Sequence, residues 1–159
     1  MKNKKGFLLA EETLKIVIAL ISIGLLVYLL ISLYLSNKDE QNLELAKSSL
    51  EHLSKQINSK TSEVEVYNPD GWSLLSWPYE GKVPLSCSNL GWGNCLCICK
   101  TPLVRRNKNY LENCDGNGIC SETKNLVVKK GDIQLPIEID NPPLKLKINY
   151  GEEIIIFEK

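Results

Sequence analysis

The first hydrophobic feature of the chain is a long run near its N-terminus. Residues 16–35 are consecutive positions without a charged side chain. At about 1.5 Å per residue, a helix of this length crosses a bilayer hydrocarbon core of about 30 Å. Ser22 and Ser32 interrupt the aliphatic side chains, and their hydroxyls can hydrogen-bond to the helix backbone. The run therefore predicts one membrane-spanning helix, because so long a charge-free stretch is rare in soluble domains.

A second hydrophobic pattern follows the run and has the period of a helix. Its apolar residues recur at steps of three and four, at Leu43, Ala46, Leu50, Leu53 and Ile57. This spacing gives one apolar stripe on an amphipathic helix. No proline or glycine interrupts residues 25–58, so we expect one continuous helix, with residues 7–35 in the membrane and residues 36–58 amphipathic. The stripe packs on a domain of the same chain or, alternatively, pairs with another chain.

From residue 59 the pattern changes to that of β-strands. Residues 63–66, 133–139 and 144–148 alternate between apolar and polar, and residues 154–157 form a last apolar strand. Pro136 indicates an edge strand or a bulge. We therefore expect an α+β fold, in which the long N-terminal helix precedes a small, antiparallel, β-rich domain over residues 59–159. Its C-terminal part is predicted to be an antiparallel meander.

Large aromatic side chains lie among turn residues between positions 71 and 120. They are Trp72, Trp77, Tyr79 and Trp92. We expect them to fill the core, because large aromatics dominate burial in small domains. The alternative is an exposed aromatic surface that binds glycans or a partner protein. The single histidine, His52, lies on the amphipathic helix, where we expect it to be solvated.

The distribution of charge orients the chain in the membrane. Lys2, Lys4 and Lys5 precede the span, whereas Lys38 beyond it is followed at once by two acids. Because lysine and arginine accumulate on the cytoplasmic side, we expect a cytoplasmic N-terminus and an external domain, with the chain in the cell membrane. The apolar run is longer than that of a cleaved secretory signal, so it stays as an anchor. The net charge is zero, with 19 basic and 19 acidic side chains, and predicts no nucleic-acid partner.

Six cysteines lie in the external domain: Cys87, Cys95, Cys97, Cys99, Cys114 and Cys120. An even number outside the cell predicts disulfides. The middle residues read Cys95-Leu96-Cys97-Ile98-Cys99, so on a strand these three sulfurs share one face. Bridges within this triplet are unfavourable, because alternate Cα atoms lie about 6.6 Å apart and their Cβ bonds are parallel. Each member of the triplet then pairs with one of the other three cysteines.

Two alternatives to this pairing stay open. A hairpin through Asp115-Gly116 and Asn117-Gly118 would bridge Cys114 to Cys120. A thiolate metal cluster would form if the domain faced a reducing compartment. Structural zinc sites favour Cys-x-x-Cys pairs, which the triplet does not contain. We therefore expect disulfides, with no metal and no other cofactor.

The residues before the span resemble a known processing signal. Lys4-Lys5-Gly6-Phe7 is followed by Glu11, the fifth residue counted from Phe7. This arrangement is similar to the class III signal of type IV pilin-like precursors. The resemblance implies that residues 1–6 are a basic leader, that a prepilin-type peptidase cleaves between Gly6 and Phe7, and that Glu11 pairs with the new N-terminal amine of a neighbouring subunit. Alternatively, Glu11 and Lys15 form an i, i+4 pair at the membrane interface.

The other motifs indicate no catalysis. The sequence has no Ser/His/Asp set, no phosphate-binding glycine loop and no Cys-x-x-Cys redox motif. We expect the basic residues Lys100, Arg105, Arg106 and Lys108 to form a solvated loop rather than a phosphate site. The predicted protein is a structural subunit and not an enzyme. Its expected partners are the lipid bilayer, the peptidase, and further copies or a pilus assembly machinery that builds a surface filament. The alternative is a monomeric, single-pass membrane-anchored binding domain.

Overall fold

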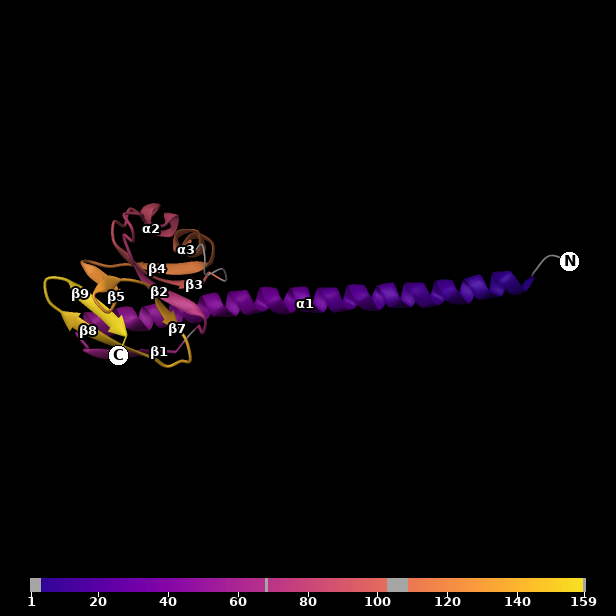
Figure 1. Cartoon of the computed structure of the whole chain (residues 1–159), viewed down its shortest axis with the longest axis horizontal. Coiled ribbons are helices and arrows are strands. Elements are labelled where there is room, and N and C mark those ends of the chain that lie inside the picture. The colour runs from indigo at the N-terminus through magenta and orange to yellow at the C-terminus, as the bar shows by residue number, and fades with distance from the viewer. Residues whose placement is uncertain (1–3, 68, 103–108, 159) are drawn as a thin grey trace. The chain divides into compact units, whose positions relative to one another are not determined.

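A computed structural model describes the backbone of residues 4–67, 69–102 and 109–158, and the side chains of these ranges from residue 13 onward (Figure 1). The chain divides into two compact units, Met1–Glu40 and Gln41–Lys159, and we call the second unit the head. One helix, α1 (Lys4–Asn58), contributes residues to both units. A continuous helix that ends at Asn58 was the prediction, and the structure confirms it.

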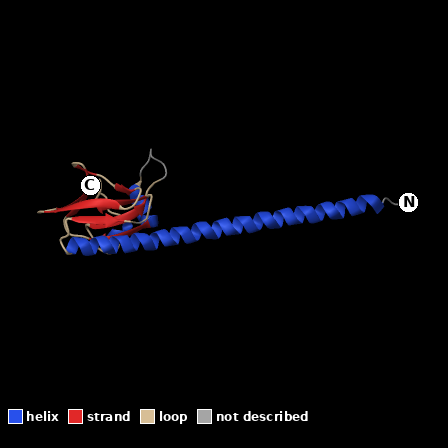
Figure 2. Cartoon of the chain, turned by 90° about the horizontal axis from the view of Figure 1, so that it is seen from below, coloured by secondary structure: helices blue, strands red, loops and turns tan. Residues whose placement is uncertain are grey.

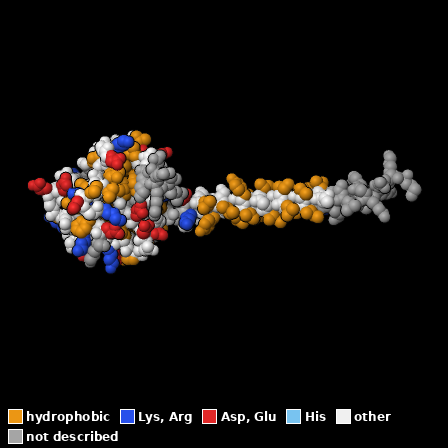
Figure 3. Space-filling model, in the orientation of Figure 1, with side chains coloured by type: hydrophobic (Ala, Val, Ile, Leu, Met, Phe, Trp, Pro, Cys, Tyr) orange, Lys and Arg blue, Asp and Glu red, His pale blue; other side chains and the backbone are white. Residues whose placement is uncertain are grey.

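The first unit consists of the N-terminal part of α1. All its described side chains, from Thr13 to Glu40, are exposed, and Figure 3 shows apolar side chains along most of this stretch. The Ser22 hydroxyl donates to the Ile18 carbonyl at 2.8 Å, as predicted for a serine inside an apolar helix. Among the residues that the structure describes, α1 is the one helix long and apolar enough, by length and composition, to cross a membrane.

The described strands of the head form two sheets (Figure 2). The five-stranded sheet has the order β1 (Glu63–Val66), β8 (Leu144–Tyr150), β9 (Ile154–Glu158), β5 (Leu126–Lys130) and β6 (Ile133–Gln134). The four-stranded sheet has the order β4 (Gly118–Glu122), β3 (Cys95–Lys100), β2 (Trp72–Trp77) and β7 (Ile137–Ile139). Every pairing between these strands is antiparallel except that of β5 with β9, which is parallel. The predicted antiparallel, β-rich domain is confirmed in this sense.

The main core of the head lies between α1 and the two sheets. Ala46, Leu50, Leu53 and Ile57 are buried on one face of α1, and they share one apolar cluster with side chains of β1, β2, β3, β5, β7, β8 and β9. The predicted stripe therefore packs on the head of its own chain. Leu43, the first residue of the stripe, is exposed. His52 lies on the exposed side of the helix, as predicted.

The four-stranded sheet is the middle layer of the head, because both faces of its central strands are buried. On β2, Trp72 and Leu74 point into the main core, whereas Leu75 and Trp77 point into a second cluster. The second cluster is covered by two short helices, α2 (Leu85–Ser88) and α3 (Tyr110–Asn117), which we call the cap (Figure 1). The predicted burial of Trp72 and Trp77 is confirmed.

Two hydrogen-bonded side chains connect the sheets through β2. The backbone N–H of Val128 on β5 donates to the Ser76 hydroxyl at 2.8 Å. The Gln134 side-chain amide on β6 donates to the Ser76 carbonyl at 3.1 Å. Ser76 is buried, so these bonds satisfy polar groups that would otherwise be costly to bury.

Two predictions about the C-terminal strands are wrong. Residues 133–139 do not form one strand, because β6 ends the five-stranded sheet and β7 ends the four-stranded sheet. Pro136 lies between them, and its lack of an N–H prevents a continuous ladder. Ile133 is accordingly 65% exposed although it fits the apolar alternation. The antiparallel meander is wrong as well, since β7 is in a different sheet from β8, and among the strands from β6 to β9 only β8 and β9 pair with each other.

Candidate functional site

The predicted processing and assembly residues lie near the start of α1. The backbone at Gly6, Phe7 and Glu11 is helical, but their side chains lie outside the described part of the chain. Cleavage after Gly6 and the pairing of Glu11 with an amine therefore stay predictions. The described residues that follow them form the exposed apolar stretch of α1.

The six cysteines of the head form three disulfides. Cys87 of α2 bridges Cys95, with an S–S distance of 1.97 Å. Cys97 bridges Cys120 of β4, at 2.01 Å. Cys99 bridges Cys114 of α3, at 1.97 Å. Each member of the triplet on β3 thus has a partner outside the triplet, as the alternation predicted, and we call the six residues the sulfur cluster.

The alternation of β3 separates the sulfur cluster from the main core. Cys95, Cys97 and Cys99 face the cap, whereas Leu96 and Ile98 face α1 and the main core. The register then selects the partners: Cys97 lies directly opposite Cys120, and Cys99 lies opposite Gly118, where α3 ends. The alternative bridge between Cys114 and Cys120 is wrong, because the Asp-Gly and Asn-Gly dipeptides do not make a hairpin; the chain is helical through Asn117.

Aromatic side chains enclose the sulfur cluster. Trp77 and Tyr110 are buried beside it, and Tyr79 lies between them, with ring centroids 6.0 Å from Trp77 and 6.5 Å from Tyr110. Both ring pairs meet edge to face, an arrangement that adds to the gain from area burial. Trp92 is partly buried against the same cluster. The aromatic residues between positions 71 and 120 therefore fill the interior, in agreement with the prediction.

Gly118 lies where the chain passes closely between the cap and the sheet. A Cβ atom at this position would lie 2.7 Å from the Cys114 carbonyl oxygen and 2.9 Å from the Cys99 sulfur. We expect Gly118→Ala to lower the free energy of unfolding by about 1–3 kcal/mol, because an overpacked site must move its backbone. Thermal unfolding of the full chain in detergent measures the effect.

The matched control for this variant is Gly116→Ala, two residues earlier on α3. A Cβ atom at Gly116 has no atom within 4 Å, and alanine favours a helix over glycine by up to about 1 kcal/mol. The control should therefore leave the head unchanged or slightly stabilised. Equal unfolding temperatures for both variants would contradict the close packing at Gly118.

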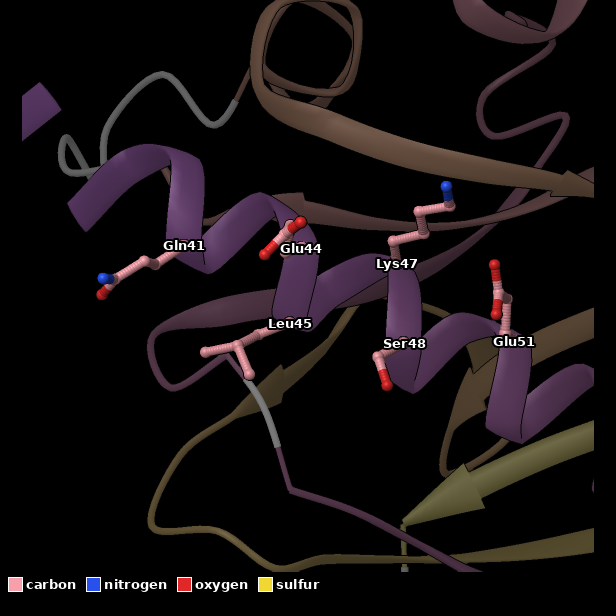
Figure 4. A pocket seen from close by; sticks show the side chains of 6 residues that line it. All are labelled: Gln41, Glu44, Leu45, Lys47, Ser48 and Glu51. Atoms are coloured by element: carbon pink, nitrogen blue, oxygen red, sulfur yellow. The ribbon is translucent and has the colours of Figure 1, made fainter. Parts of the chain in front are cut away.

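A surface hollow of about 590 Å³ lies along α1 in the described part of the head. Figure 4 shows its side chains, all from that helix: Gln41, Glu44, Leu45, Lys47, Ser48 and Glu51. No nucleophile among these six is hydrogen-bonded to a base, and we assign no chemistry to the hollow. Of the predicted basic cluster, Lys100 ends β3, and Arg105, Arg106 and Lys108 lie outside the described residues.

Glu65 on β1 and Tyr67, just after it, are an exposed pair whose pKa values are shifted. The Tyr67 hydroxyl donates to Glu65 Oε2 at 2.6 Å, and Lys145 lies 3.6 Å from Glu65 Oε1. The hydrogen bond from Tyr67, supported by Lys145, holds the pKa of Glu65 below its ordinary value. The same hydrogen bond to Glu65 raises the pKa of Tyr67.

We expect Glu65→Gln to return the pKa of Tyr67 toward its ordinary value. The folded-state pKa of Tyr67 is raised above the unfolded value, so its contribution to stability is complete below the unfolded pKa and is lost as pH rises through the folded pKa. Carbon-13 NMR titration of tyrosine rings, with Tyr67→Phe to assign the signal, measures this change. If the pKa of Tyr67 were the same in the original chain and in Glu65→Gln, the hydrogen bond between Tyr67 and Glu65 would be contradicted.

Comparison of the chain with protein-family models, with curated proteins and with solved structures finds no match in any of the three.

Proposed function

We propose that the protein is a membrane-anchored, extracytoplasmic structural subunit that resembles a type IV pilin and assembles through its N-terminal helix. The observation that carries the proposal is the difference in side-chain burial between the two parts of α1. Its described side chains up to Glu40 are exposed and mostly apolar, whereas from Ala46 onward one face is buried in the head. One helix thus offers an uncovered apolar surface in the first unit and a buried face in the head.

The exposed apolar stretch of α1 needs a partner other than water. Large side chains such as Leu20, Ile23 and Leu33 are more than half exposed, and each Å² of apolar surface removed from water contributes roughly 25 cal/mol. A bilayer removes this surface, as do neighbouring copies of the helix within it. The lysines before the span support a cytoplasmic N-terminus and an external head. Disulfides in the head agree with that compartment.

Assembly through the helix rests on the resemblance around Gly6, Phe7 and Glu11. After cleavage before Phe7, the new N-terminal amine carries a positive charge near the membrane. A carboxylate such as Glu11 is expensive in an apolar environment unless it is paired. Pairing it with the amine of a neighbouring subunit satisfies both groups and sets the register between copies. The exposed apolar stretch then packs in a bundle.

The test compares Glu11→Gln with its neighbour Glu12→Gln, each in the full chain in membranes with a prepilin-type peptidase. Both substitutions remove one negative charge, but the resemblance assigns the pairing to Glu11 alone. We expect Glu11→Gln to abolish oligomers that are captured by amine-reactive crosslinking and sedimentation, whereas Glu12→Gln retains them. Monomers in the unsubstituted chain would instead favour the alternative, a membrane-anchored binding domain without assembly.

A further inference from the structure

We propose that four of the six cysteines, Cys87, Cys95, Cys97 and Cys120, form a tetrathiolate zinc site when the chain is reduced. Their sulfur atoms come from α2, β3 and β4 and all lie within 4.8 Å of one another. In the oxidised head they form two of the three bridges. The fold thus gathers four soft ligands around one point, which is the ligand set of a structural zinc site. We call these four residues the zinc group.

Two of the six distances between these sulfurs are close to those of a tetrahedral site. A zinc–sulfur bond of about 2.3 Å gives sulfur–sulfur edges of about 3.8 Å. The Cys87 and Cys97 sulfurs are already 3.8 Å apart, and those of Cys95 and Cys97 are 3.9 Å apart. The two bridged pairs must open from about 2 Å on reduction. The site therefore forms by side-chain movement, with the backbone elements already in place.

The third bridge is not part of the zinc group. Cys99 lies on the same face of β3, but its sulfur is turned to Cys114 on α3. Among the described residues, the four-sulfur group includes neither Cys99 nor Cys114. The spacing of the triplet does not indicate a zinc site, because only two of its three cysteines are in the zinc group. The other two ligands come from α2 and β4.

The surroundings of the zinc group suit a buried metal. Cys87, Cys95 and Cys97 are fully buried and Cys120 is half-buried, and Leu75 and Trp77 in the same cluster keep water from the three buried sulfurs. The Ser86 hydroxyl lies 3.4 Å from the Cys120 sulfur, where it can donate a hydrogen bond to a thiolate. Such donors beyond the ligands orient them and tune the metal.

The conversion between the two states balances with a dithiol as reductant. Two dithiol molecules reduce the two bridges to four thiols, and each dithiol closes to a cyclic disulfide. One Zn²⁺ then binds the four sulfurs and releases four protons, because thiolates are the ligands. In the reverse direction, two molecules of a small disulfide accept four electrons from the four thiolates and, with four protons, become four thiols, which restores the two bridges and releases Zn²⁺. In a reduced chain zinc therefore joins α2 to β3 and β4. In an oxidised chain the Cys87–Cys95 bridge joins α2 to β3 and the Cys97–Cys120 bridge joins β3 to β4.

The experiment titrates Zn²⁺ into the full chain in detergent, reduced by a phosphine because dithiols chelate zinc. A chromophoric chelator competes for the ion. We expect one Zn²⁺ per reduced chain and none per oxidised chain. Cobalt substitution should give the visible spectrum of a tetrahedral four-thiolate site. No binding to the reduced chain, or an octahedral cobalt spectrum, would overturn the proposal regardless of any variant.

Two double variants remove two sulfurs each and serve as matched tests. Cys97→Ser with Cys120→Ser takes two ligands from the zinc group and should weaken binding by about 100-fold or more, since even groups beyond the ligands are worth 10–100-fold. Cys99→Ser with Cys114→Ser removes the third pair and should retain one tightly bound Zn²⁺ and the tetrahedral cobalt spectrum. Equal affinity in the two variants would overturn the assignment of the ligands.

Discussion

Replacing Leu53 with alanine is expected to lower the free energy of unfolding of the head by about 2–5 kcal/mol. Leu53 is 0% exposed on α1, inside the cluster that the helix shares with both sheets. Truncation removes apolar contacts and leaves a cavity. The two sheets that pack against α1 cannot move far enough to fill it. The change acts on the packing of the C-terminal part of α1 inside the head.

The matched control is Leu45→Ala on the same helix. Leu45 is 40% exposed and lies outside the main core, so its replacement should change stability by no more than about 0.5 kcal/mol. Urea unfolding of the full chain in detergent, followed by the fluorescence of the buried Trp72 and Trp77, measures both variants. If the two substitutions cost the same, α1 does not pack on the head through the stripe.

Removing the bridge between Cys97 and Cys120 by a double alanine substitution is expected to cost about 3 kcal/mol in the chain-entropy model. The bridge spans 23 residues, and opening it enlarges the conformational space of the unfolded chain. Cys120 lies on β4, an edge strand of the four-stranded sheet, so the folded state also loses a link at that edge. Net domain stability is typically about 5–15 kcal/mol, which makes this a large fraction.

The bridge between Cys87 and Cys95 gives the comparison, because it spans only eight residues. Its double alanine variant should also be destabilised, but by about 0.5–1 kcal/mol less than the Cys97/Cys120 variant. The difference is small because loop-closure entropy grows slowly with loop length. Hydrogen exchange should show that both variants keep the protected main core, which contains no cysteine. Loss of protection throughout the head, including Leu146 and Ile156, would contradict the separation of the two clusters.

The elements that could be predicted are those in which one face meets water. The stripe on α1 and the alternation of β1 and β8 record one buried and one exposed face. The alternation of the cysteine triplet also predicted which sulfurs share a face. The alternation reduced the number of possible disulfide pairings but did not select one. That selection depends on how β4 and the cap pack against β3.

The elements that were missed are those in which tertiary packing decides. Strand β2 reads Trp-Ser-Leu-Leu-Ser-Trp and is buried on both faces, so it shows no alternation. Helix α3 includes Gly116 and Asn117, which are poor helix formers, yet the Cys99–Cys114 bridge and the buried Tyr110 hold it against the sheet. The parallel pairing of β5 with β9 joins distant segments, and no local pattern indicates it.

The zinc group likewise could not be predicted from the sequence, because tertiary packing brings its residues together. Each pair of cysteines is separated by a different stretch of chain, and no zinc spacing is visible in the sequence. Only the antiparallel register of β3 and β4 brings Cys120 to the pair on β3, and α2 adds Cys87. By contrast, the predicted processing signal is local, so the sequence alone is enough to propose cleavage between Gly6 and Phe7, and this stays a prediction.

The central claim, a pilin-like subunit anchored by its N-terminal helix, is tested most directly by the N-terminus of the chain extracted from membranes. Intact mass and N-terminal sequencing of the protein, produced with a prepilin-type peptidase, locate the first residue. A Gly6→Leu variant, which alters the predicted cleavage site and keeps the apolar helix, is the control and should retain its leader. We expect a mature chain that begins at Phe7. A membrane-extracted chain that still begins at Met1 or Lys2 would contradict it.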